Sequence, residues 1–272
     1  MRGFSANVSA LYGGTPFEER FATASADGFE CVEFWVAEDA LRVVETVQGL
    51  ALSVSQINVD PGPGANDAGH LSDPDATAWW RSKFDESLTL AVALGCPVIN
   101  VLAGGSAAGD PHRERRTMLE NLQWALGRLE DNPVTLVLEP LNRDERPHYL
   151  LHTIDDVVDV RASLGDPANV KLLFDVYHVY QEHDDVVAAF VQHESIVGHV
   201  QLADFPGRCE PGAGEIDVAA FVVAVARSGY DGWIGLEFVS QGTASALAWT
   251  HAIPVPLYRH GVPTEIGTPT GP

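Results

Sequence analysis

Four oxygen-bearing side chains stand at or near the ends of four successive apolar segments in the second half of the chain. In order, they are Glu139, Asp175, Gln201 and Glu237. Carboxylate and amide oxygens are hard donors that suit Mg²⁺ or Mn²⁺. A single acidic residue in such a place is most often a helix cap or an ion-pair member. Burying three carboxylates together without a cation, however, is costly or forces protonation. The pattern therefore predicts a site for one divalent metal ion, Mg²⁺ or Mn²⁺.

These segments belong to a regular alternation of apolar, β-branched runs with stretches of helical period. Eight strands are predicted, at 4–9, 31–35, 52–59, 97–104, 134–142, 170–178, 197–204 and 233–238. Eight helices are predicted, at 16–28, 37–49, 75–95, 111–131, 153–165, 184–194, 217–229 and 244–253. Short links between the two kinds of element favour parallel strands joined by crossover helices.

Eight such cycles in about 250 residues match the size of a (β/α)8 TIM barrel. We therefore expect one barrel domain over residues 1–253. A doubly wound open sheet is the second choice, because it usually has fewer strands and no GxGxxG follows the first strand. Residues 254–272 contain five prolines and three glycines, which predicts an extended or loose tail instead of a ninth unit.

In a barrel the carboxyl ends of the strands converge on one rim, so the four side chains are expected to meet there. His199 and Gln201 are two residues apart and share a face of one strand, which favours a supporting role for His199. Asp175 and His178 cannot share a face of a straight strand, so the chain is expected to turn after Asp175. His178 could then bind substrate, ligate the metal or orient Asp175. Glu33, in the second strand, is either an ion-pair member or a support for the site.

Five sequence blocks resemble hydroxypyruvate isomerase, within the sugar isomerase/epimerase group of xylose isomerase-like TIM barrels. The blocks are "FSANVSALY", "LEPLNR", "FDVYH", "GHVQLADFPGRCEPGAGEID" and "GYDGWIGLEF". They keep the family's order and span residues 4–240. The resemblance implies a barrel enzyme that interconverts hydroxypyruvate and tartronate semialdehyde through an enediolate, using a divalent metal ion.

The resemblance also implies roles for individual residues. The implied metal ligands are Glu139, Asp175, Gln201 and Glu237. Glu139 and Glu237 further match the family's two acid/base carboxylates. The implied substrate contacts are Arg208, His178 and Glu145. Arg143 is a second candidate for the substrate carboxylate, and an arginine is needed there because the protein carries a net charge of −22.

Several alternatives stay open at this stage. A 2-oxo-tetronate isomerase or a ketose 3-epimerase would use the same site, and a catalytically silent sugar-acid-binding barrel would need only the arginine. Glutamine at position 201, where the 3-epimerases usually carry histidine, points to the hydroxypyruvate branch. Cys209 stands where the family often has histidine, which leaves the substrate choice open. The glycines of "EPGAGE" could also form a phosphate cradle.

The composition limits the classes of molecule that the protein is expected to bind. With 38 acidic and 16 basic residues, the surface repels nucleic acid and anionic membranes but admits a small anionic substrate at a local arginine. No apolar run is long enough for a transmembrane helix or a signal peptide. Three scattered cysteines without metal spacing are typical of reduced thiols in a cytoplasmic protein. We also expect a homo-oligomer.

Overall fold

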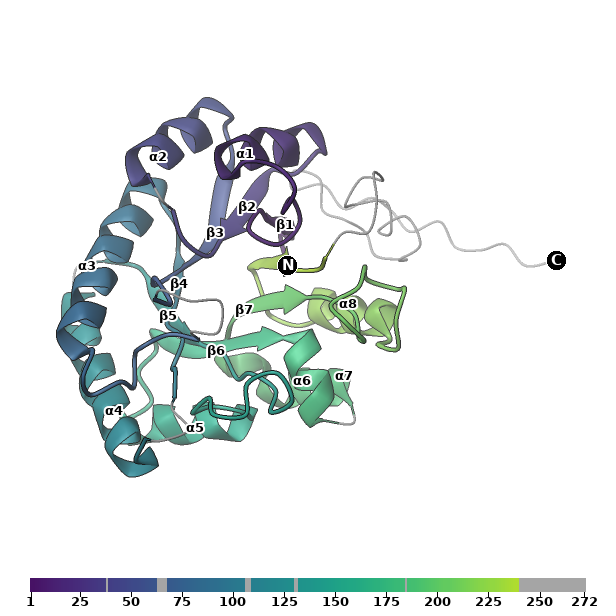
Figure 1. The fold of residues 1–272 in the computed structure, drawn as a ribbon. Coiled ribbons are helices and arrows are strands. Elements are labelled where there is room, and N and C mark those ends of the chain that lie inside the picture. The colour runs from purple at the N-terminus through teal and green to yellow at the C-terminus, as the bar shows by residue number, and fades with distance from the viewer. Residues whose placement is uncertain (38, 63–67, 106–108, 130–131, 184, 240–272) are drawn as a thin grey trace.

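The computed structural model describes residues 1–37, 39–62, 68–105, 109–129, 132–183 and 185–239. Its eight strands form a closed barrel in which every strand is parallel to the next, in chain order (Figure 1). The strands are β1 (Gly3–Asn7), β2 (Cys31–Phe34), β3 (Ser53–Asn58), β4 (Val98–Asn100), β5 (Thr135–Leu138), β6 (Val170–Asp175), β7 (Val197–Leu202) and β8 (Trp233–Leu236). The predicted (β/α)8 barrel is thereby confirmed.

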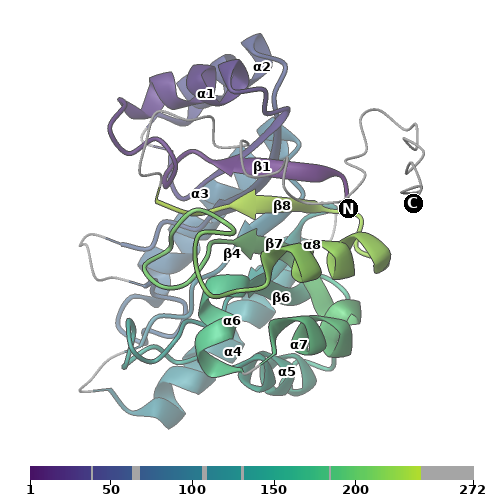
Figure 2. The same cartoon turned by 90° about the vertical axis from the view of Figure 1, so that its right-hand side faces the viewer.

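The helices lie outside the strands, as Figures 1 and 2 show. They are α1 (Phe17–Ala26), α2 (Ala40–Gly49), α3 (Thr77–Leu94), α4 (Pro111–Arg128), α5 (Ile154–Ser163), α6 (Val176–Glu182), α7 (Val186–His193) and α8 (Val218–Arg227), with a 3-10 turn, η1 (Glu194–Ile196), before β7. The predicted helix at 244–253 and the predicted tail at 254–272 lie outside the described residues.

Local signals fix the ends of several helices. Asp110 caps α4 by accepting a hydrogen bond from the His112 amide, and Pro111 occupies the first turn, where its missing N–H costs nothing. Thr153 and Asp156 form a reciprocal capping box at the start of α5. Gly95 ends α3 with a φ of 63°, a conformation that glycine adopts without penalty. The caps of α4 and α5 fix loops that follow the carboxyl ends of β4 and β5, and Gly95 fixes the turn that leads into β4.

Packed aromatic side chains join the barrel to its helices. The rings of Phe174 in β6, Phe190 in α7 and Phe221 in α8 lie 5.5–5.7 Å apart, and all three are fully buried. Trp80 and Phe84 of α3 are stacked with centroids 5.5 Å apart. Burying such large apolar surfaces is the main driving force for folding. The strands therefore form a rigid base for the rim.

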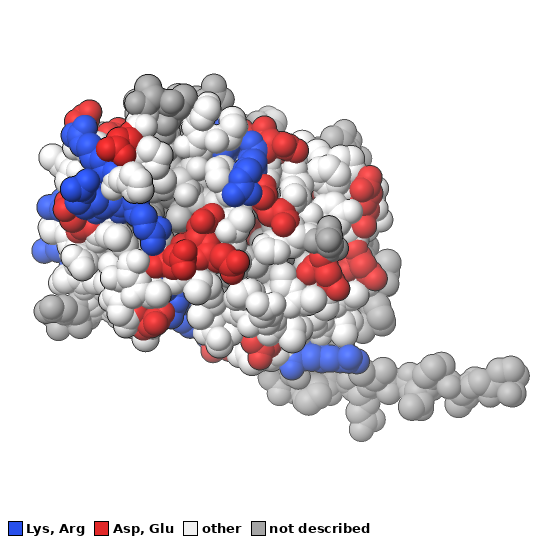
Figure 3. Space-filling model, turned by 90° about the horizontal axis from the view of Figure 1, so that it is seen from below, with Lys and Arg blue, Asp and Glu red and all other residues white. Residues whose placement is uncertain are grey.

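Acidic and basic side chains lie beside one another on the face drawn in Figure 3. Many arginines are paired with carboxylates, for example Arg128 with Asp85 at 2.9 Å. Among the described residues, the model contains no helix with the length and apolarity needed to span a bilayer.

Candidate active site

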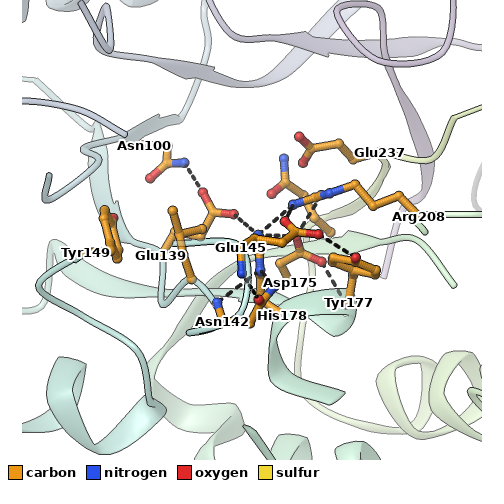
Figure 4. Close-up of polar contacts among 12 residues, drawn as sticks. Asn100, Glu139, Asn142, Glu145, Tyr149, Asp175, Tyr177, His178, Arg208 and Glu237 are labelled. Carbon is orange, nitrogen blue, oxygen red and sulfur yellow. Dashed lines mark hydrogen bonds and ion pairs between the residues drawn. The ribbon is translucent and has the colours of Figure 1, made fainter. Parts of the chain in front are cut away.

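The carboxyl ends of β5 to β8 bring acidic and polar groups together at the rim. Carboxylate oxygens of Glu139 and Asp175 and a ring nitrogen of His178 all lie within 4.8 Å of one another, and all three residues are buried. Gln201 stands beside Asp175 in the β6–β7 register. Glu237 follows β8 and lies across the guanidinium of Arg208 from the others (Figure 4). The predicted residues thus surround one centre.

One carboxylate oxygen of Asp175 caps a helix, and the other faces the centre. It is the last residue of β6 and the cap of α6, where its Oδ1 accepts a hydrogen bond from the Tyr177 amide at 2.9 Å. Its Oδ2 is buried and accepts no hydrogen bond from the described residues, although Arg208 Nη1 lies 3.6 Å away. Burial raises the pKa of Asp175, against the opposing charge of Arg208. A buried carboxylate oxygen without a hydrogen bond is what a metal cation would satisfy.

Glu139 is arranged in the same way. Its Oε2 accepts a hydrogen bond from Asn100 Nδ2 at 2.7 Å, and its Oε1 lies 3.9 Å from His178 Nε2. Burial, with the nearby charge of Asp175, raises the pKa of Glu139 to about 8. Without a bound cation, this carboxyl group therefore keeps its proton to a higher pH than an exposed glutamate does.

Gln201 is oriented from inside the barrel. Its Nε2 donates to Glu33 Oε1 at 2.8 Å, so its Oε1 must point the other way, where it is buried and has no hydrogen-bonding partner in the part of the chain that the structure describes. Glu33 is fully buried and also contacts His199 Nε2 at 2.8 Å and Ser55 Oγ at 3.1 Å. Glu33 and His199 thus lie beneath Gln201 as its support. Of the two roles open for Glu33, the geometry favours this one.

Glu237 approaches the centre from β8. Its Oε1 accepts a hydrogen bond from Trp35 Nε1 at 3.0 Å. Burial raises the pKa of Glu237 well above its ordinary value; Arg208 opposes the rise, and the charges of Glu139 and Asp175 add to it. Glu237 is therefore a second carboxyl group that favours the protonated form, close to the first.

His178 lies on α6 and not on an extended strand, so the prediction of a strand to residue 178 was wrong. The chain turns after Asp175, as its spacing to His178 required. His178 Nδ1 accepts from the Asn142 amide at 3.2 Å and faces Asn142 Nδ2 at 2.7 Å. The other ring nitrogen, Nε2, lies 2.7 Å from Arg208 Nη2, which can only donate. Burial, followed by the charge of Arg208, lowers the pKa of His178 well below its ordinary value, so the ring is neutral. Hydrogen-bond donors of the protein therefore face both ring nitrogens of His178.

Arg208 enters the centre from the loop between β7 and α8. Its Nη1 lies 3.6 Å from Asp175 Oδ2 and its Nη2 lies 3.6 Å from Glu145 Oε2. The guanidinium also covers the Tyr177 ring at 4.5 Å. Burial alone would lower the pKa of Arg208, but the surrounding carboxylates outweigh burial and raise it. Arg208 Nη2 also lies 2.7 Å from His178 Nε2 and can only donate to it, so the guanidinium and the imidazole lie side by side at the centre.

Two expectations for this region are corrected. Arg143 does not reach the centre, because it is exposed and pairs with Glu182. The "EPGAGE" loop is no phosphate cradle, because buried Asp204 already accepts its amide hydrogens: the Gly212 and Gly214 amides donate to Oδ2 at 2.9 and 3.0 Å. Asp204 therefore fixes the loop that carries Arg208.

The donor set fits a divalent cation. Glu139, Asp175 and Gln201 each present an oxygen that accepts no hydrogen bond from the described residues, and two of these oxygens are fully buried. Three nearby carboxyl groups all have raised pKa values, which a cation would reverse. The cluster can bind a metal ion.

Several residues of the centre were not predicted. Asn100 holds Glu139, Trp35 holds Glu237, and the Asn142 amide donates to His178 Nδ1. Asn100 is the last residue of β4 and Trp35 directly follows β2. The strand-end rule that found the carboxylates would have found these two as well, had it been applied to neutral polar groups.

Comparison with known proteins identifies the family of this chain. The family model described as the xylose isomerase-like TIM barrel matches residues 21–254. The chain belongs to this family. Within it, the 2-oxo-tetronate isomerase of Cupriavidus necator is 34% identical over 254 residues, covering 92% of this chain and 97% of that protein. Hydroxypyruvate isomerase of Escherichia coli is 32% identical over 255 residues, covering 92% and 98%.

A solved structure has the same fold as this chain. It is described as an AP endonuclease of family 2 from Brucella melitensis, and it matches with a TM-score of 0.87 at 28% identity, covering 93% of this chain and 99% of that one. The curated relatives confirm the resemblance to the hydroxypyruvate isomerase group.

Proposed function

We propose that this chain is an isomerase of small 2-oxo hydroxy acids that interconverts hydroxypyruvate and tartronate semialdehyde by proton transfer. One observation carries the proposal. Glu139 and Glu237 both lie close enough to Arg208 for their charges to act on it, and each has one oxygen held by a neighbour. The second oxygen of each accepts no hydrogen bond from the described part of the chain. Relatives in the family that are named as isomerases of hydroxypyruvate and 2-oxo-tetronate support the same class of reaction.

Arg208 would bind the substrate's carboxylate. Its guanidinium offers two N–H groups side by side, which suits bidentate contact with a carboxylate. Such a cation is needed in a protein of net charge −22. His178, whose Nε2 lies 2.7 Å from Arg208 Nη2, would contact the substrate beside the guanidinium.

The two glutamates would move the proton. One removes a proton from C3 of hydroxypyruvate, and a proton is returned at C2, while the hydroxyl proton passes from the oxygen on C3 to the oxygen on C2. The atoms balance, and the carbonyl has moved by one carbon. A divalent ion, Mg²⁺ or Mn²⁺, held by Glu139, Asp175, Gln201 and Glu237, would supply Lewis-acid stabilisation of the enediolate charge.

Substitution of the two glutamates tests this proposal. Glu139→Gln and Glu237→Gln keep the side-chain shape but cannot carry the proton, so we expect kcat for hydroxypyruvate to fall about 10²- to 10⁴-fold in each. Product formation would be followed by NMR, and metal content would be measured to separate loss of the base from loss of the ion.

The matched control is Glu120→Gln, on the exposed face of α4. It should retain the activity of the unsubstituted protein. Full activity in both active-site variants would remove the proton-transfer assignment and favour a barrel that only binds sugar acids.

A further inference from the structure

Tyr177 and Arg208 together hold one carboxylate of the protein itself at the edge of the catalytic centre. The Tyr177 hydroxyl donates a hydrogen bond to Glu145 Oε1 at 2.5 Å, and Arg208 Nη2 lies 3.6 Å from Glu145 Oε2 (Figure 4). The guanidinium lies over the Tyr177 ring, 4.5 Å from its centroid, so the two donors are held beside each other. Each oxygen of one carboxylate thus faces its own donor, an arrangement that suits the carboxylate of a ligand equally well.

Glu145 is the most exposed of the carboxyl groups near Arg208. Its side chain is 37% exposed, whereas the side chains of Glu139 and Asp175 are 9% and 1% exposed. Glu237, the fourth carboxyl group whose charge acts on Arg208, is also less exposed than Glu145. An exposed ion pair contributes little free energy, because water stabilises the separated charges almost as well. Glu145 is therefore the carboxylate that can leave Arg208 most easily.

Only the side chain of Glu145 would have to move. Its backbone amide donates to Asn142 Oδ1 at 2.9 Å, which fixes this part of the loop after β5. The residue also lines a cleft of about 1010 Å³ between the loops that follow β3, β4 and β5. Rotation of the side chain into this cleft would take the carboxylate away from Arg208 without a change in the fold.

Charge disfavours the presence of Glu145 and a substrate carboxylate on the same donors. The other three carboxyl groups near Arg208 belong to the candidate metal site, where a divalent ion would offset their charge. Glu145 lies outside that set. A ligand carboxylate at Arg208 would therefore lie beside a like charge, in a partly buried place where water screens the repulsion poorly.

We propose that Tyr177 joins Arg208 in binding the substrate's carboxylate, and that Glu145 occupies this pocket until the substrate displaces it. This inference rests on the proposed function for the identity of the ligand. The Tyr177 hydroxyl belongs to a residue that is 4% exposed, and it exchanges one carboxylate acceptor for another, so it is never left without a partner. A neutral ligand cannot replace Glu145 on the guanidinium, and the pocket thereby selects for acids.

Binding of glycerate tests the displacement without turnover, because glycerate has the carboxylate of hydroxypyruvate but no carbonyl group to isomerise. In Glu145→Ala the pocket has lost its resident carboxylate, so calorimetry should show glycerate binding about three- to tenfold more tightly. Glyceramide, in which a neutral carboxamide replaces the carboxylate, should gain less than about twofold. Unchanged or weaker glycerate binding in Glu145→Ala, or an equal gain for glyceramide, would overturn the displacement.

Tyr177→Phe tests the second donor, and its effect should depend on residue 145. In the unsubstituted protein the hydroxyl is lost to Glu145 and to glycerate alike, so the affinity for glycerate should change less than about threefold. In the Glu145→Ala background only the hydrogen bond to the ligand is lost, and the affinity should fall about tenfold. Equal effects in the two backgrounds would overturn the sharing of this hydroxyl.

The matched controls are Asp144→Ala and Tyr180→Phe. Asp144→Ala removes one negative charge from the neighbouring exposed position, and Tyr180→Phe removes a hydroxyl of α6 that faces Glu215. Neither should change the affinity for glycerate by more than about twofold. A gain in Asp144→Ala equal to that in Glu145→Ala would overturn the proposal, because it would assign the gain to net charge.

The binding measurements are independent of catalysis. If the expected gain in Glu145→Ala were found in a protein that converts no hydroxypyruvate, the carboxylate pocket would stand and the proposed isomerase activity would fall. If hydroxypyruvate were converted but Glu145→Ala bound glycerate no more tightly, the activity would stand and the displacement of Glu145 would be overturned.

Discussion

At the level of single residues, each side chain of the centre is oriented by the hydrogen bond that one of its polar atoms makes to a neighbour. The Tyr177 amide holds Asp175 Oδ1, Asn100 holds Glu139 Oε2, and Glu33 holds Gln201 Nε2. In each case the remaining oxygen has one direction left, toward the shared centre. Neutral neighbours therefore orient the groups that do the chemistry.

Asn100 offers a test of this orientation. Its hydrogen bond favours the ionised form of Glu139 and so opposes the rise in that carboxyl's pKa. In Asn100→Ala the pKa of Glu139 should rise further, and the acidic limb of the kcat/KM profile should move to higher pH. At pH 7 we expect a loss of about three- to tenfold.

The control for this variant is Asn169→Ala, which lies before β6 at the opposite end of the barrel and should leave the profile unchanged. An Asn100→Ala profile that keeps its acidic limb in place would show that Asn100 does not tune Glu139.

At the level of elements, the loop between β7 and α8 places the cation of the site. Asp204 is fully buried and accepts amide hydrogens from Phe205, Gly212, Gly214 and Ile216 at 2.8–3.0 Å. A single carboxylate thus organises a loop that has no regular secondary structure. The position of Arg208 depends on it.

Asp204→Ala should therefore act on substrate binding. With four amides left without their acceptor, the loop should loosen, and KM for hydroxypyruvate should rise about tenfold or more, with a smaller change in kcat. Steady-state kinetics would measure both values, alongside Asp159→Ala at an exposed position of α5. A KM equal to that of the Asp159→Ala control would contradict this role for the loop.

The elements also show what local sequence patterns could predict. Apolar runs separated by helical stretches predicted all eight strands. A strand that is buried on both faces appears in the sequence as a continuous apolar segment. The end of β6 was placed three residues late. "VYHV" is as β-branched and aromatic as a strand, but the Asp175 side chain caps the Tyr177 amide and starts α6. Capping by a side chain overrode propensity there.

At the level of the whole molecule, the unpredicted contacts are those that cross the barrel. Glu33 and Gln201 are 168 residues apart, and Trp35 and Glu237 are 202 apart. Gly235 lies between β1 and β7, and a Cβ there would lie 2.2 Å from Glu33 Oε2. Strand order predicts that such residues share a rim, but their pairing depends on register and barrel closure, which a single sequence does not encode locally.

The shared carboxyl cluster predicts how stability depends on pH. Glu139 has a pKa of about 8 in the folded chain against an ordinary value of 4.5. Between these values the folded state binds more protons than the unfolded state, so the free energy of unfolding should fall as pH rises from 5 to 8. The raised pKa values of Asp175 and Glu237 act in the same direction.

Urea unfolding in the presence of a chelator would measure this fall, with the midpoint lower at pH 8 than at pH 6. Because Mn²⁺ displaces protons from its ligands, saturating Mn²⁺ should reduce or abolish the fall, and Mn²⁺ affinity should increase with pH. If the urea midpoint fell equally between pH 6 and pH 8 with and without Mn²⁺, the carboxyl cluster would not be the metal-binding site.

Solvent deuterium exchange tests the central claim most directly. Hydroxypyruvate would be incubated with the protein in D₂O and followed by NMR, with Mn²⁺, with chelator, and with the Glu139→Gln variant. We expect deuterium to enter the product at C2, the exchange to stop with chelator and return with Mn²⁺, and the variant to be silent. Product that forms without solvent deuterium, or exchange that continues unchanged in chelator, would contradict metal-assisted proton transfer at this centre.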